Sequence, residues 1–176
     1  MDSMLDNYRF LARYNTWFND RLYGACERLD DAARKAPRGA YFGSIHATLN
    51  HLLWGDTMWL ARFAAQGEAL DALPADLLAL PAGARYETEL HADWAALRAH
   101  RARLDAAIEA WLAALPADFP QRTMRYSNTK GVQREHPMWQ ALTHFFNHQT
   151  HHRGQVTTLL MQAGVDVGVT DLIALV

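Results

Sequence analysis

Four stretches of the sequence carry apolar residues three or four positions apart, and this period most constrains the fold. Residues at i, i+3 and i+4 share one face of an α-helix. In the first stretch, residues 4–29, the apolar stripe contains Leu5, Tyr8, Leu11, Phe18 and Leu22. An amphipathic helix buries such a stripe against another element. We therefore predict an all-α fold in which four long helices pack as a bundle.

Start and stop residues set the expected bounds of the other three helices. Serine is a favoured N-cap, glycine suits the left-handed position after a helix, and proline is tolerated at the first helical position. On these rules the second helix runs from Ser44 to Gln66, the third from Tyr86 to Leu115, and the fourth from Pro137 to Gly164. In the tail, residues 165–176, we expect one further helical turn that Thr170 caps.

Two segments between the helices have distinct patterns. Residues 67–85 are rich in Pro, Gly and Ala, which predicts a long crossover between the second and third helices. Such a crossover would let these two helices run parallel. Residues 123–136 contain two short β-like runs around Asn128-Thr129-Lys130-Gly131, which favours a small hairpin or loop before the fourth helix. The expected fold is thus an up-down four-helix bundle with these two additions.

Composition narrows the class of protein. A chain of 176 residues fits one domain, which we expect to span 1–176. The formal charge is only −2 and both signs are interspersed, so neither nucleic acid nor an anionic membrane is an expected partner. No apolar run approaches the roughly 20 residues of a membrane span, and the first residues lack the pattern of a secretion signal. With Cys26 as the single cysteine, we expect a cytoplasmic protein.

The placement of the histidines points to a metal site. Four of the nine lie in the segment His144-Phe-Phe-Asn-His148-Gln-Thr-His151-His152. Residues i and i+4 of a helix are about 6 Å apart in rise, so their imidazoles can converge on one ion. His148 with His152, His144 with His148, and His148 with His151 are all possible pairs by spacing. A lone histidine more often lines a polar face between helices, but a pair on an apolar helix favours ligation.

A third ligand has to come from another helix, because zinc-type centres use at least three protein ligands. His51 is the leading candidate, since it lies mid-helix on the stripe that faces the bundle. His46 is about 140° around the same helix, so we do not expect both to face inward. His91, His100 and His136 stand in charged or loop contexts and are expected to be solvated. The chain contains no zincin, di-iron carboxylate, phosphate-loop or dinucleotide motif.

Three blocks of the sequence resemble the DinB/YfiT-like family of metalloenzymes, which is unrelated to the DNA polymerase that shares the name. They are Arg13-Tyr14-Asn15-x-Trp17, then Thr48-Leu49-Asn50-His51-Leu52-Leu53, then Phe146-Asn147-His148-Gln149-Thr150-His151-His152-Arg153-Gly154-Gln155. The resemblance implies that His51, His148 and His152 are the metal ligands. It also implies a four-helix bundle, zinc or nickel as the metal, and a homodimer. Family members with assigned chemistry depend on low-molecular-weight thiols, whereas most have no assigned reaction.

From the residues and the resemblance together, we expect a metal-dependent enzyme. The reaction would be a thiol-dependent S-transfer to a small electrophilic substrate, or a hydrolysis. The alternative is a non-enzymatic stress-response scaffold in which the metal only joins the helices. Candidate hydrogen-bond partners of the ligands are Asn15, Asp56, Asn147 and Gln155. Arg153 is expected either to bind an anionic substrate or to join helices through a salt bridge.

Overall fold

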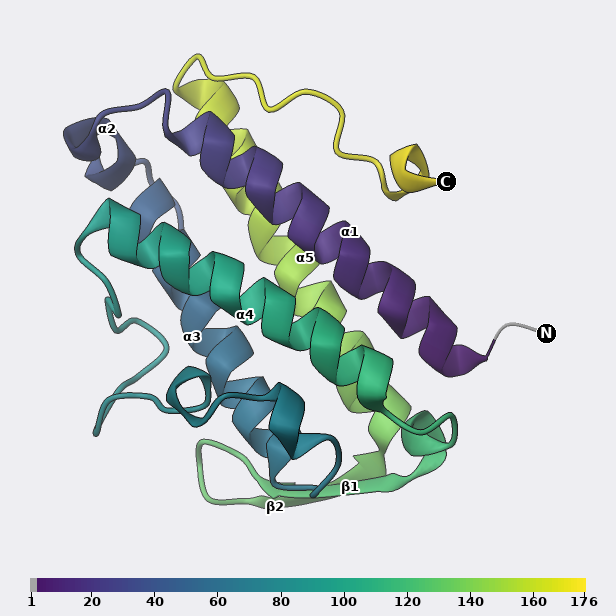
Figure 1. Ribbon diagram of the computed structural model, residues 1–176. Coiled ribbons are helices and arrows are strands. Elements are labelled where there is room, and N and C mark those ends of the chain that lie inside the picture. Colours follow the sequence, from purple (N-terminus) through teal and green to yellow (C-terminus); the bar gives the residue numbers. More distant parts are fainter. Residues whose placement is uncertain (1–2) are drawn as a thin grey trace.

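The structure is a computed structural model that describes residues 3–176, and this part of the chain is mostly helical. It contains five α-helices, four short 3-10 turns and one two-stranded antiparallel sheet (Figure 1). The α-helices are α1 (Met4–Cys26), α2 (Asp31–Lys35), α3 (Ile45–Ala64), α4 (Trp94–Ala114) and α5 (Met138–Gln162), and the strands are β1 (Thr123–Ser127) and β2 (Gln133–Pro137). The predicted all-α architecture is therefore present, together with the predicted hairpin.

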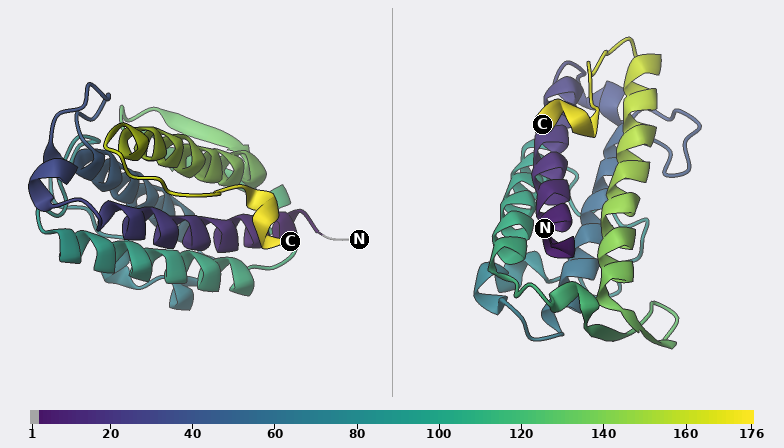
Figure 2. Two further views of the ribbon diagram at one scale, coloured as in Figure 1. Left: turned by 90° about the horizontal axis from the view of Figure 1, so that it is seen from above. Right: turned by 90° about the vertical axis from the view of Figure 1, so that its right-hand side faces the viewer.

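The four long helices lie side by side and enclose the apolar core. α1 packs against α4 and α5, and α3 packs mainly against α5 (Figure 2). The chain ascends in α1 and α5 and descends in α3 and α4, so the long crossover at residues 65–93 does leave α3 and α4 parallel (Figures 1 and 2). The interface of α3 with α5 matters most here, because the histidines of interest lie on these two helices.

Side-chain caps explain where the long helices begin. Ser3 and Asp6 form a reciprocal capping box at α1, and Ser44 accepts a hydrogen bond from the backbone N–H of Ala47 at α3. Asp93 caps α4 in the same way, through the N–H of Ala96. Each cap satisfies a donor that the first helical turn leaves without a partner. The predicted N-cap Ser44 is confirmed.

Several predicted boundaries were wrong, each for a local reason. The third long helix begins at Trp94 and not at Tyr86, because residues 85–93 form turns and bends against α3 before Asp93 caps the helix. Pro137 is the N-cap of α5, not its first helical residue. The final turn, Leu172–Leu175, follows Asp171 and has no side-chain cap from Thr170. The short helix α2 was not predicted.

The hairpin closes the end of the molecule where α3 ends and α5 begins (Figure 1). Its register pairs Thr123 with Pro137 and Ser127 with Gln133. In the turn, Asn128 accepts hydrogen bonds from the N–H groups of Lys130 and Val132, and Gly131 has φ of 77°. A positive φ suits glycine because it has no Cβ.

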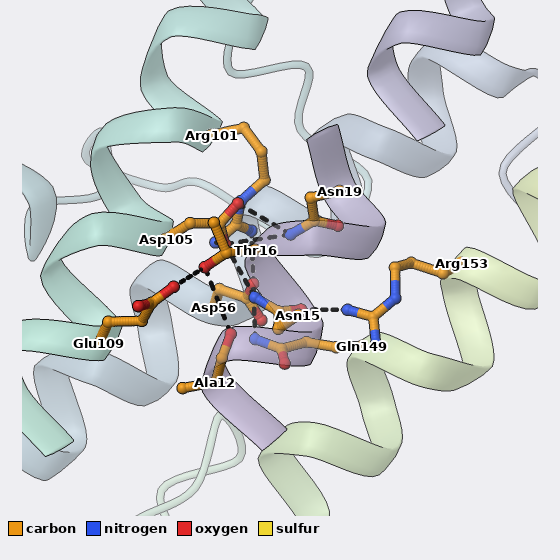
Figure 3. A network of polar contacts seen from close by, with 10 residues as sticks. All are labelled: Ala12, Asn15, Thr16, Asn19, Asp56, Arg101, Asp105, Glu109, Gln149 and Arg153. Atoms are coloured by element: carbon orange, nitrogen blue, oxygen red, sulfur yellow. Dashed lines mark hydrogen bonds and ion pairs between the residues drawn. The ribbon is translucent and has the colours of Figure 1, made fainter. Parts of the chain in front are cut away.

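A buried network of charged and polar side chains joins all four long helices (Figure 3). Asp56 of α3 accepts hydrogen bonds from Arg101 at 2.5 Å and from Gln149 at 3.1 Å. Arg101 also pairs with Asp105, one turn further along α4, at 2.6 Å. Burial raises the pKa of Asp56 to about 6, although the Arg101 guanidinium opposes this shift.

The α1 side of the same network is made of amides. Asn15 donates to Asp105 at 2.8 Å, and Asn19 donates to it at 3.0 Å. Arg153 of α5 donates to the Asn15 side-chain oxygen, and its guanidinium lies 4.8 Å from the centre of the Phe18 ring. Arg153 therefore joins helices from a fully buried position, but through the Asn15 amide and not through the predicted salt bridge. Because the side chain is only 1% exposed, the alternative role in binding an anionic substrate does not fit its position.

Among the described residues, no helix is both long enough and apolar enough to pass through a bilayer.

Candidate metal centre

The imidazoles of His51, His148 and His152 meet between α3 and α5. The Nε2 atom of His148 lies 3.2 Å from Nε2 of His51 and 3.1 Å from Nε2 of His152. Two nitrogens held at about 2.0–2.1 Å from one tetrahedral ion would be about 3.3 Å apart. One ligand atom from each of the three residues lies within 4.8 Å of the other two. The structure therefore brings together the three side chains that the sequence singled out, in a cluster that could hold a metal ion.

Hydrogen bonds set the tautomers of two of these rings. Nδ1 of His51 lies 2.8 Å from the backbone oxygen of Tyr86, and Nδ1 of His152 lies 2.8 Å from the side-chain oxygen of Gln155. Because an oxygen of this kind can only accept, both Nδ1 atoms carry the proton. In a neutral ring Nε2 then has a free lone pair. Two such lone pairs face His148, whose Nε2 can donate to only one of them at a time.

The electrostatics of the cluster keep the rings neutral. Burial, together with repulsion from His152 and His51, lowers the pKa of His148 to about 3. Burial also lowers the pKa of His152 to about 4, and burial lowers the pKa of His51. Neutral imidazole is the form that binds a metal. A divalent ion would accept all three lone pairs, so the donor set fits a transition metal.

A glycine on the facing helix makes room for the central ring. A Cβ atom built on Gly55 of α3 would lie 2.7 Å from Cε1 of His148. Glycine in a helix is less stable than alanine by about 1 kcal/mol. We infer that Gly55 is needed because the His148 ring takes the space that a side chain would fill.

The other histidines near the cluster have different surroundings. His151 is exposed, and its Nε2 is 3.2 Å from the amide nitrogen of Gln155. His144 points toward Trp59, with ring centres 4.9 Å apart, and not into the cluster. The alternative pairs that the spacing left open, His144 with His148 and His148 with His151, are therefore not the ones that converge.

Two expectations about the remaining histidines were wrong. His46 and His51 are both buried, because residues 89–91 cover the His46 side of α3 and the His91 carbonyl lies 2.8 Å from His46 Nε2. His91, His100 and His136, all expected in solvent, are half-buried, and His91 Nε2 lies 2.8 Å from His100 Nδ1. The errors for His46, His91 and His100 arise because sequence periodicity does not show that the crossover packs against α3.

Of the four expected partners of the ligands, only Gln155 contacts one of them. Asn15 and Asp56 belong to the buried network, and Asn147 is exposed. The partner that sequence reasoning missed is the Tyr86 carbonyl. A backbone oxygen carries no residue-type signal, so only the path of the crossover could have revealed it.

Two hollows border the cluster. The larger, of about 620 Å³, reaches His148 and lies between α3, the hairpin and the segment around Tyr86. The smaller, of about 390 Å³, reaches His51 and His152 and is lined by Phe42, whose ring stacks on His51 with centres 3.9 Å apart. The cluster is thus accessible from the His148 side and from the side of the other two ligands.

These features define a helical protein with a candidate three-histidine metal centre. A comparison with models of protein families matches residues 4–175 to the DinB family, so the chain belongs to the DinB family. Searches of curated proteins and of solved structures gave no significant match. The expected family is thereby confirmed over nearly the whole chain.

Proposed function

We propose that this protein is a metal-dependent enzyme that holds one divalent transition metal, zinc or nickel, on His51, His148 and His152. One observation carries the proposal: three imidazole nitrogens from two helices meet within 4.8 Å, and two of them are held in the tautomer that presents a lone pair. Three protein ligands leave a coordination position for a reactant, as in catalytic zinc centres.

Such an ion on three neutral ligands keeps its double charge and lowers the pKa of a thiol or water that binds it. The protein contributes the positions of the three rings. Tyr86 and Gln155 hold two of the rings by their Nδ1 atoms, and Gly55 allows the third to approach. Hydrogen bonds of this kind raise the affinity of a site by fixing ring orientation.

The two hollows favour a reaction between two molecules. A transfer reaction has to place a nucleophile and an electrophile at one centre, and the cluster borders one hollow on each of two sides. We therefore propose S-transfer from a low-molecular-weight thiol to a small electrophile as the reaction, with metal-assisted hydrolysis as the second candidate.

The competing proposal is a non-enzymatic scaffold, acting in a stress response, in which the ion joins α3 to α5. Removing the metal with a chelator distinguishes the enzyme from the scaffold. If the metal is catalytic, the chelated protein stays folded and loses activity. If the metal is only structural, chelation lowers the melting temperature sharply and no thiol or hydrolytic activity is found in the loaded protein.

The first experiment is elemental analysis of protein purified without a histidine tag. We expect about one equivalent of metal per chain, and its loss in His148→Ala. His151→Ala is the matched control, since His151 is adjacent to a ligand but exposed. A screen of low-molecular-weight thiols against model electrophiles then tests the reaction. Wild type that binds no metal, or His148→Ala that binds as much metal as wild type, would refute the centre. Metal binding without activity would support the scaffold.

We further propose, from the order of the helices, that residues 1–176 form one domain and that the four long helices form an up-down bundle with the long crossover. A cytoplasmic homodimer is the proposed assembly. Light scattering after size-exclusion chromatography tests the oligomeric state, and a monomer at micromolar concentration would refute the dimer.

A further inference from the structure

The larger hollow beside His148 contains an arginine without an acidic partner. Arg62 lies on α3, two helical turns beyond Gly55, and both residues line this hollow. Its guanidinium lies 4.8 Å from the ring centre of Trp59 and 4.7 Å from that of Tyr126. The two aromatic rings lie close together, with centres 5.5 Å apart, and attract the guanidinium through its charge, so its N–H groups remain for another partner.

Seven of the fifteen arginines differ from Arg62 in this respect. Arginines that pair with a carboxylate among the described residues are Arg9, Arg34, Arg98, Arg101, Arg103, Arg122 and Arg125. Within residues 3–176, which the structure describes, no carboxylate lies within ion-pair distance of Arg62. Burial lowers the pKa of Arg62, which reflects a charge that is partly removed from water. A half-buried cation of this kind is an anion site by its chemistry.

The rest of the hollow has matching properties. Arg85 is a second basic residue of its lining, and none of the described lining residues is acidic. Trp54, Met58 and Trp59 supply apolar and aromatic surface. A volume of about 620 Å³ is typical of a small-molecule site. Two helical turns correspond to a backbone rise of about 10 Å between Gly55, which borders His148, and Arg62, so one small molecule can reach from the arginine toward the histidine cluster.

We propose that this hollow binds a small substrate with an aromatic or apolar body and one carboxylate, and that Arg62 recognises the carboxylate. The planar fork of the guanidinium matches the two oxygens of a carboxylate. The opposite end of the substrate then lies against His148. This inference rests on the proposed function for the role of that opposite end, whereas carboxylate recognition by Arg62 does not depend on the metal.

The test measures binding of arylalkanoates of increasing length, from benzoate to 4-phenylbutyrate, and of their neutral amides, by calorimetry on the full chain. Each ligand is titrated into zinc-loaded and metal-free protein, so that direct binding to the metal is separated from binding to Arg62. The variants are Arg62→Gln, Arg62→Lys and the control Arg125→Gln. Arg125 is an exposed arginine on β1, in the hairpin that borders the hollow, and it pairs with Glu135.

We expect the carboxylates to bind metal-free wild type at least about tenfold more tightly than their amides, as for a charge-assisted pair. Arg62→Gln should abolish this preference, Arg62→Lys should restore part of it, and Arg125→Gln should keep it. Equal binding of acid and amide, equal binding to wild type and Arg62→Gln, or no binding by wild type would each overturn the proposal. Metal content, measured separately, should be unchanged in Arg62→Gln, so a failed metal centre and a failed anion site give different results.

Discussion

Replacing Gly55 by alanine should separate metal binding from folding. The added Cβ would lie 2.7 Å from Cε1 of His148, about 0.7 Å closer than the 3.4 Å at which ordinary contact begins. The contacted atom belongs to the far end of a side chain, so the ring can rotate away at small cost in stability. The metal site has no such freedom, because metal–nitrogen distances are tolerated only to within about 0.2 Å.

The expected loss of metal affinity follows from comparing the displacement of about 0.7 Å with the tolerance of about 0.2 Å. A ring displacement of about 0.7 Å exceeds the tolerance of the site several-fold, so we expect metal affinity to fall by at least about 100-fold, near the upper end of changes around metal ligands. The free energy of unfolding without metal should change by less than about 1 kcal/mol, since alanine favours the helix by about that amount and offsets the crowding.

Gly24→Ala is the matched control, because Gly24 lies within α1 and no atom is within 4 Å of its Cβ position. It should stabilise the metal-free protein by up to about 1 kcal/mol and leave metal affinity unchanged. Affinity is measured by competition with a chromophoric chelator, and stability by urea unfolding. If Gly55→Ala binds metal as tightly as wild type, the close approach of α3 to His148 is not a requirement of the site, and the reasoning fails.

Three further outcomes are expected. Gln155→Leu should weaken metal binding by about 10- to 100-fold in a chelator competition, because His152 loses the acceptor of its Nδ1 proton. Metal-free protein should lose stability in urea titrations as the pH falls from 6.5 toward 4, because the unfolded chain gains protons on these histidines in that range while the folded chain, with pKa values of about 3 for His148 and about 4 for His152, does not. Asp105→Ala should lower the free energy of unfolding by about 3–5 kcal/mol in urea, since it breaks a buried ion pair.

Each of these has its own control. Gln66→Leu changes a glutamine of the same size that bonds the hairpin backbone and should leave metal affinity intact. His148→Gln should make the stability of metal-free protein less dependent on pH. An equal dependence in both proteins would contradict the assignment of this pH dependence to His148. Arg103→Met breaks an exposed pair on the same helix as Asp105 and should be indistinguishable from wild type. If Asp105→Ala also behaves like wild type, the buried network adds nothing to stability.

Local patterns predicted the four long helices, the hairpin and two of the three clustered histidines, because these depend on positions close in the sequence. The pair His148 and His152 is one of three that helical spacing allows, and the structure places both Nε2 atoms together. His51 was selected because it lies on the buried stripe of its helix. Choosing among the possible pairs needed the resemblance to a family, since spacing allowed three of them.

What could not be predicted depends on the path of the crossover. Leu90 and Trp94 continue a helical period, so the third long helix was extended back to Tyr86. In the structure Asn50 bonds the backbone of His91 in both directions, which holds that segment against α3. These tertiary hydrogen bonds outweigh a weak local preference for helix. The same segment supplies the Tyr86 carbonyl to His51, so the boundary error and the missed partner have one cause.

The buried network and the metal centre share α5 in a way that connects stability to the site. Gln149 and Arg153 directly follow the two ligands His148 and His152, and successive helical residues point about 100° apart. Gln149 is held by Asp56 on α3, and Arg153 by Asn15 on α1. A helix whose buried side is tied at two points one turn apart cannot rotate about its axis without breaking those bonds. The ties therefore also set the direction in which both histidines face α3, although the network touches neither imidazole.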